Sequence, residues 1–231
     1  MTQQQEIEDD VQVDSKSAKT RARILDAAAQ VLSRKGYAGT RLSDVAEVAQ
    51  LQAPAIYYYF KSRELLIEEV MWTGTAELRK KVTKTLSELP EEAGPLKRIE
   101  VAVETHIRYV LEVSDHATAA IRNSNQVPEG IRERQRAEEL KAGTVWRQLF
   151  EDAMSAKAIR GDLDITACRL LVIGALNWAP EWYNPRRMSI DSVVRTAVSM
   201  VRNGIATPES LEAEFGNVKP EKKGRPARAA S

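Results

Sequence analysis

The fold of this chain is decided by residues 36–66, which read GYAGTRLSDVAEVAQLQAPAIYYYFKSRELL. The stretch opens with Gly36, and glycine readily adopts the backbone conformation that closes a helix. Apolar residues then recur at the spacing of a short helix, at Leu42, Val45, Ala46 and Ala49. Pro54 fits the first turn of another short helix, because the amide that proline lacks would have no partner there. Two short helices separated by a tight turn are therefore predicted.

A longer helix is predicted immediately before this stretch. Its apolar positions fall on one helical face, at Ile24, Leu25, Ala28, Val31 and Leu32. Thr40 is expected to cap the first short helix, with Asp44 in the first turn. A long helix followed by two short ones is typical of a helix-turn-helix, in which the second short helix enters the major groove of DNA.

The distribution of charge supports a DNA-binding amino-terminal segment. Residues 16–63 carry nine basic and three acidic residues, a net charge of +6, whereas residues 1–15 carry five acidic residues and no basic one. Residues 219–231 add five basic residues and one acidic residue, so residues 64–218 hold −4 of the whole chain's +1. A basic head on an acidic body suits a protein whose head alone meets a polyanion.

Composition excludes several other classes of protein. The 231 residues contain no apolar run of 18 or more, and the first residues are acidic and polar. We therefore expect neither a membrane span nor a signal peptide, and a cytoplasmic location. One cysteine and two histidines leave no metal-ligand cluster at recognisable spacing, so neither a metal nor a cofactor is expected. An enzyme is the rival class, but no catalytic motif supports it.

The rest of the chain is predicted to be helical, which gives an all-α fold. The expected helices cover 62–87, 95–114, 115–125, 129–158, 165–182 and 189–205, with prolines and glycines at their boundaries. The predicted division is a disordered acidic tail at 1–15, a helix-turn-helix domain at 16–63, a ligand-binding and dimerisation domain at 64–206, and a basic, unstructured tail at 207–231.

The run from Gly36 to Leu66 resembles the DNA-binding signature of the TetR family of transcriptional regulators. Gln50 stands where the family usually has a turn glycine, and Arg63 replaces the usual lysine. The resemblance implies a homodimeric repressor that binds a palindromic double-stranded DNA operator and responds to a small-molecule effector. An activator, or a ligand-binding protein on the same fold, remains the alternative.

The resemblance also implies which side chains meet DNA. The expected set is Thr40, Arg41, Gln52, Ala53, Ala55, Tyr57, Tyr58 and Lys61. Glutamine can pair with adenine and alanine can contact a thymine methyl group, whereas hydroxyl groups and lysine bind phosphates without reading sequence. The alternative for Tyr57 and Tyr58 is that they pack the small domain, as Ile56 and Phe60 are expected to do.

The body is expected to supply a dimer interface. Residues 165–179 are apolar almost all round, and the next helix has an apolar face between Ile190 and Val201. Together they are expected to dimerise as a four-helix bundle. Such a two-fold protein would place its recognition helices roughly 34 Å apart, one turn of DNA.

The pattern Trp178-x-x-x-Trp182-Tyr183-x-Pro185 is similar to the end of a TetR subgroup that senses acyl-CoA thioesters from fatty-acid or steroid breakdown. Gly174 stands where that subgroup often has an arginine. Candidate ligand-contacting residues are His106, Tyr109, Arg122, Trp146, Asn177, Trp178 and Trp182. For each of them a core, surface or interface role is the alternative.

The carboxyl-terminal run from Lys222 to Arg228 resembles an AT-hook, whose Gly-Arg-Pro core lies in a narrow minor groove. The alternative is a solubilising basic tail.

Overall fold

In the computed structural model the described residues are 3–216, with side chains from Lys16 onward. They form α1 (Gln3–Gly39), α2 (Leu42–Ala49), α3 (Ala53–Tyr59), α4 (Arg63–Ser87), α5 (Pro95–Arg108), a π-helical turn (Tyr109–Val113), α6 (Asp115–Asn123), α7 (Glu129–Ser155), α8 (Ile165–Trp182), α9 (Ile190–Ile205) and α10 (Pro208–Phe215). One isolated β-bridge joins Ile159 to Ala206. The predicted all-α class is confirmed.

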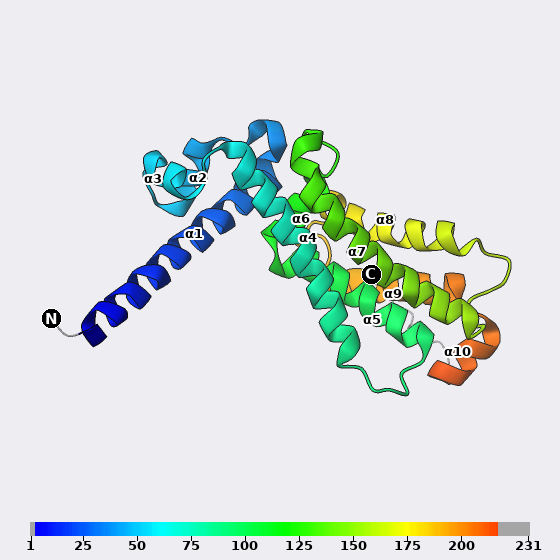
Figure 1. Ribbon diagram of the computed structural model, residues 1–231. Helices are drawn as coiled ribbons and strands as arrows, with labels where there is room; N and C mark the ends of the chain where they lie inside the picture. Colours follow the sequence, from blue (N-terminus) through cyan, green and yellow to red (C-terminus); the bar gives the residue numbers. More distant parts are fainter. Residues whose placement is uncertain (1–2, 217–231) are drawn as a thin grey trace, which may run out of the picture.

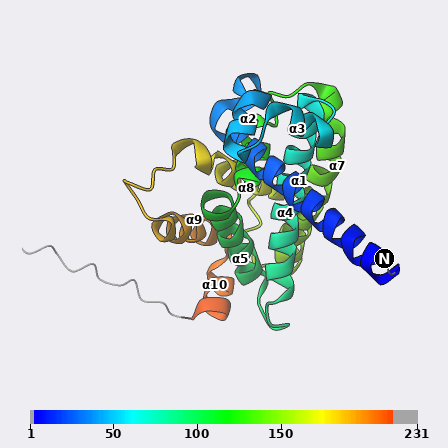
Figure 2. The same cartoon turned by 90° about the vertical axis from the view of Figure 1, so that its left-hand side faces the viewer.

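The helices are arranged as a small head on a larger body (Figure 1). Helices α1 to α3 form the head, and α4 runs from the head into the body, where it packs against α5, α6 and α7. Figure 2 shows that the amino-terminal part of α1 projects away from the rest of the chain. Within residues 3–216 no helix is both long and apolar enough to cross a bilayer.

Two hydrophobic cores hold this arrangement together. The head core contains Ile24, Leu32, Ile56 and Phe60, and it continues into the body through Ala119 of α6. The second core surrounds the fully buried Phe150 of α7. The predicted packing role of Ile56 and Phe60 is confirmed. Because α6 contributes to the head core, the head is docked on the body rather than tethered to it.

Two turns in the head have unusual backbone conformations. Gly36 has φ 69°, and α1 kinks there, close to the helix end predicted from the sequence. Gln50 ends α2 with φ 54° and ψ 46°, the left-handed conformation that glycine adopts without strain. For a residue with a Cβ atom this conformation costs about 1–2 kcal/mol. Gln50 therefore places strain at the tight turn of the helix-turn-helix.

The structure corrects the prediction for the start of α2. The N-cap position is Arg41, which makes no side-chain capping bond. Thr40 is buried instead, and its hydroxyl donates a hydrogen bond to the Gly36 carbonyl at 2.8 Å. The predicted N-cap role of Thr40 is wrong because this hydroxyl turns back onto the preceding turn rather than forward onto α2.

The structure also differs from the predicted tails. Helix α1 begins at Gln3, so residues 3–15 are helical where an unstructured tail was predicted, and neither proline nor glycine interrupts them. At the other end, Pro208–Phe215 form α10, whose N-cap is Thr207. Glu214 of α10 accepts hydrogen bonds from the backbone amides of Leu96, at 3.1 Å, and Lys97, at 2.9 Å. The AT-hook prediction at 222–228 lies outside the described residues.

Candidate DNA-binding surface and ligand cavity

The head exposes most of the side chains predicted to meet DNA. Gln52 is the N-cap residue of α3 and is exposed. Tyr58 is 75% exposed and Tyr57 52%, although both are large aromatic residues. Arg41 and Lys61 are exposed on either side of this helix pair, whereas Ala53 and Ala55 are half-buried. The exposure of the two tyrosines argues against the alternative that they pack the small domain.

Thr40 is the exception within the predicted set, because it is only 2% exposed. Its hydroxyl is occupied by the Gly36 carbonyl, so the side chain is not presented on the surface of the head.

Arg63 has a structural role that the sequence interpretation missed. Its Nε donates to the carbonyl of Thr40 at 2.7 Å, and a terminal nitrogen donates to the carbonyl of Tyr37. The guanidinium also lies 4.4 Å from the centre of the Tyr37 ring. Lysine, the usual residue, lacks the planar fork that makes these contacts together. Arg63 therefore fixes the loop before α2 to the start of α4.

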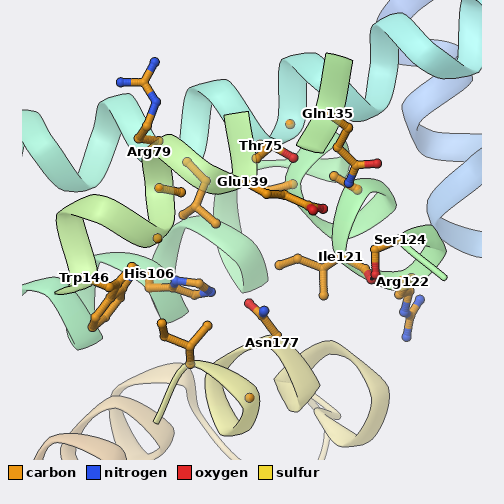
Figure 3. Close-up of a pocket in the computed structure, with 18 of the residues that line it drawn as sticks. Thr75, Arg79, His106, Ile121, Arg122, Ser124, Gln135, Glu139, Trp146 and Asn177 are labelled. Carbon is orange, nitrogen blue, oxygen red and sulfur yellow. The ribbon is translucent and has the colours of Figure 1, made fainter. Parts of the chain in front are cut away.

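A cavity of about 720 Å³ lies in the body, with walls from α4, α5, α6, α7 and α8 (Figure 3). This volume is within the range of small-molecule sites. Five of the predicted ligand residues line it: His106, Arg122, Trp146, Asn177 and Trp178. The residues Thr75, Arg79, Gln135 and Glu139 also line it, and the sequence interpretation missed them. They lie on α4 and α7 and become neighbours only when these helices pack together.

Tyr109 and Trp182 do not line this cavity. The Tyr109 hydroxyl donates a hydrogen bond to Oε2 of Glu77 at 3.2 Å. Burial, and then the nearby negative charge of Glu77, raise the pKa of Tyr109. Trp182 lies near the end of α8 and is 46% exposed. The structure therefore separates these two residues from the other predicted ligand contacts.

The inner end of the cavity contains buried polar groups. His106 is 3% exposed there, and Gln135, on the opposite side of the cavity in Figure 3, is 2% exposed. Neither ring nitrogen of His106, nor Oε1 of Gln135, has a hydrogen-bond partner among the described residues. Burial lowers the pKa of His106 to about 4, and the neighbouring amide of Asn177 opposes this shift only in part. His106 is therefore neutral near pH 7.

Arg122 of α6 connects the cavity wall to the head. Its Nη1 donates to the carbonyl of Ser33 in α1 at 2.9 Å. Its Nε donates to Oε1 of Glu181 at 2.7 Å, and Nη2 donates to the carbonyl of Pro180 at 2.6 Å, both in α8. One side chain that lines the cavity thus joins α6, α8 and the head.

Asn123, the next residue, makes a second connection and is fully buried. Its Oδ1 accepts a hydrogen bond from the backbone amide of Tyr37 at 2.8 Å. Its Nδ2 donates to the carbonyls of Leu32, at 3.3 Å, and Ala119, at 2.9 Å. Asn123 does not line the cavity. Through these hydrogen bonds its side chain holds the end of α1 against α6.

Comparisons with known proteins agree with this architecture. Residues 24–70 match the family model described as "Bacterial regulatory proteins, tetR family". Residues 92–205 match the model described as "Tetracyclin repressor-like, C-terminal domain". The two matches cover the head and most of the body.

Relatives and solved structures extend over most of the chain. The HTH-type transcriptional repressor KstR2 of Rhodococcus jostii is 22% identical over 195 residues, covering 82% of this chain and 93% of that protein. The structure of AibR in complex with isovaleryl coenzyme A and operator DNA has a TM-score of 0.71 at 20% identity, covering 78% and 97% of the two chains. The ketosteroid transcriptional regulator KstR2 of Mycobacterium tuberculosis has a TM-score of 0.70 at 16% identity, covering 81% and 95%.

The fold and the exposed helix pair α2–α3 together define a helix-turn-helix DNA-binding protein. The chain belongs to the TetR family of transcriptional regulators.

Proposed function

We propose that this protein is a ligand-responsive repressor that binds a palindromic operator as a homodimer in the cytoplasm and leaves it when a small molecule fills the body cavity. The observation that carries this proposal is that α6 contacts both the body cavity and the head. Ile121 and Arg122 line the cavity, while Arg122 and Asn123 hold the end of α1. A change at the cavity wall therefore acts directly on the head.

The exposed side chains of α3 support sequence reading by the head. Gln52 and Tyr58 would contact base edges, while Arg41, Tyr57 and Lys61 would contact phosphates. This division follows from their chemistry, since phosphate contacts position a protein and base contacts specify the site. Ala53 and Ala55, which are half-buried, would offer methyl groups to thymine.

The outer face of α8 supports dimerisation with a second copy of the chain. Leu171 is 74% exposed, Trp178 65% and Trp182 46%, and these positions recur along one side of the helix. A Cβ atom at Gly174, on the same side, would meet nothing within 4 Å. Large apolar side chains beside a small residue suit close helix packing, so α8 and α9 would form the four-helix interface.

Acyl-CoA thioesters are the first effector class to test. AibR, which shares the fold, is bound to isovaleryl coenzyme A in its structure. Here Arg169 of α8 lines the cavity, is half-buried and has no ion pair within residues 16–216. The next residue, Leu170, also lines the cavity and is 55% exposed, so this part of α8 lies at the open side of the cavity. A guanidinium at that position suits the phosphates of coenzyme A.

The experiment that tests the function is selection of binding sites from randomised duplex DNA by the full chain. Selected sites are then titrated with medium- and long-chain acyl-CoA and with free coenzyme A as the control. A palindrome with half-sites one turn apart, released by a thioester but not by coenzyme A, supports the proposal. A palindrome that no thioester releases removes the thioester assignment, and the absence of any selected sequence contradicts the repressor itself.

The link through α6 has its own test in Arg122→Leu, with Arg169→Leu as the matched control at the outer end. Coupling between effector and DNA sites is commonly about 1–3 kcal/mol. We expect Arg122→Leu to remove most of the effector-induced loss of operator affinity. Arg169→Leu should weaken thioester binding and leave the coupling intact. An unchanged response in Arg122→Leu would place the coupling elsewhere.

A further inference from the structure

The inner end of the body cavity contains a polar site centred on His106, whose ring nitrogens lack partners in the described part of the chain. The two ring nitrogens of His106 have no hydrogen-bond partner within the described residues, and His106 is almost fully buried. Asn177 points into the same part of the cavity from α8, and the edge of Trp146 lies beside the imidazole with ring centres 6.0 Å apart (Figure 3). Buried polar groups without partners are rare in folded proteins, and they mark sites that a ligand or water completes.

The charges around this site do not match an anion. The guanidinium of Arg79 is paired with Glu138 at 3.0 Å, and Figure 3 shows it pointing away from the cavity. Arg122 is paired with Glu181 at 2.7 Å. Glu139, whose side chain enters the cavity, adds a negative charge. Of the three arginines that line the cavity, only Arg169 has no ion pair within residues 16–216, and it adjoins the exposed Leu170. A carboxylate buried at His106 would therefore have no free counter-ion beside it, and burying an unpaired charge is strongly unfavourable.

An uncharged oxygen atom of a ligand suits the His106 imidazole and the Asn177 amide. A neutral imidazole has one N–H donor and one acceptor nitrogen, and the amide of Asn177 also has both. A hydroxyl group can accept from one and donate to the other, and a ketone or ester carbonyl can accept from both donors. Apolar side chains, among them Val82, Trp146 and Ile173, also line the cavity.

We propose that His106 and Asn177 form a recognition site for an uncharged hydroxyl or carbonyl oxygen at the inner, hydrophobic end of the effector. The inference deepens the proposed function, because it rests on the cavity being the effector site. It applies to the part of the effector that is buried, whether or not the outer end carries coenzyme A.

The test compares three probes of equal chain length, 1-decanol, 2-decanone and decanoate, at pH 7.5 with the full chain. Binding is followed by the fluorescence of the cavity tryptophans, Trp146 and Trp178. We expect decanol and decanone to bind at least about tenfold more tightly than decanoate, the order of one net hydrogen bond. Equal or tighter binding of decanoate, or no binding of the two neutral probes, overturns the inference.

Two variants separate recognition from a structural role. His106→Phe keeps an aromatic ring but removes both nitrogens, so the preference for decanol over decanoate should fall by about tenfold. Its melting temperature without ligand should rise by roughly 2–4 °C, because two unpaired polar atoms leave the interior. His106→Gln keeps a donor and an acceptor and should retain the preference.

An unchanged preference in His106→Phe, or a variant less stable than the wild type, overturns the inference. Operator binding by the same proteins is measured separately. Loss of site-selective DNA binding would contradict the proposed function, whereas the ranking of the three probes would still decide the chemistry of the site.

Discussion

Two buried polar side chains at the head, Thr40 and Asn123, have hydrogen-bond partners, whereas two in the cavity, His106 and Gln135, have atoms without partners among the described residues. In the head, Thr40 donates to the Gly36 carbonyl, and where α6 meets the head, Asn123 bonds the backbone at both ends of its amide. In the cavity, His106 and Oε1 of Gln135 have no partner among the described residues. The difference suits a chain that completes the head by its own contacts and, as proposed above, takes up another molecule at His106 in the cavity.

The largest expected effect on stability comes from removing the hydrogen bonds of the buried Asn123. Asn123→Leu would leave the Tyr37 amide and the Leu32 carbonyl without their buried partner, at a cost of about 3 kcal/mol in the free energy of unfolding. Urea denaturation followed by circular dichroism measures this loss. Ser124→Ala is the control, since Ser124 directly follows α6 and its hydroxyl bonds only the carbonyl of Ile121 in that helix. A similar loss in both variants would contradict the role given to Asn123.

The buried, unpartnered imidazole of His106 predicts how the free energy of unfolding depends on pH. The pKa of His106 is about 4 in the folded chain, against 6.5 for an ordinary histidine, because of burial. Above about pH 6.5 His106 is neutral in both the folded and the unfolded chain, so it does not lower the free energy of unfolding. As the pH drops toward 4, the unfolded chain takes up the proton first, and the free energy of unfolding falls. At pH 5 the expected loss is about 2 kcal/mol. Urea titrations at pH 7 and pH 5 should show this loss in the wild type and not in His106→Phe.

A smaller effect distinguishes the two kinds of contact expected on the head surface. Gln52→Ala should relax the preference at one base position by roughly tenfold, because a paired hydrogen bond to a base is lost. Lys61→Glu should instead weaken binding to all sequences alike and lower the salt dependence of affinity. Competition binding with single-base operator variants at two salt concentrations measures both. A selected site unchanged by Gln52→Ala would remove that residue from base reading.

The smallest effect lies at the turn between α2 and α3. Gln50 has the left-handed conformation, so Gln50→Gly relieves strain there, partly offset by the greater freedom of glycine in the unfolded chain. We expect a gain of about 0.5–1 kcal/mol in the free energy of unfolding. Thermal unfolding measures it, with Glu47→Gly in the helix α2 as the control that should lose stability. A loss in both variants would contradict the strain assigned to Gln50.

Local signals in the sequence predicted much of the fold. The apolar spacing gave the helices of the head, and the predicted span 165–182 coincides with α8. The missed α10 also had a local signal, since Thr207 precedes Pro208 in the order of an N-cap and a first-turn proline. The π-helical turn at Tyr109–Val113 had none, and a continuous helix was predicted across it.

The DNA-binding surface was easier to predict from the sequence than the cavity, for a physical reason. Residues of α3 are close in sequence, so one helix places Gln52, Tyr57 and Tyr58 on the surface. The cavity is formed by five helices, and Gln135 and Glu139 face it only because α7 packs on α4. The contacts of Arg122 with Ser33 and Glu181 join residues more than fifty positions apart, which spacing alone does not reveal.

The capping of α5 by Glu214 has a consequence for the order in which the protein is made. The first amides of α5, at Leu96 and Lys97, receive their acceptor from a residue more than a hundred positions later. Free amides at the start of a helix weaken it. During synthesis from the amino terminus, the head can therefore fold while α5 still lacks this partner. The body receives this cap only after α10 has left the ribosome, so a chain interrupted before Pro208 would have a formed head on a body whose α5 lacks its cap.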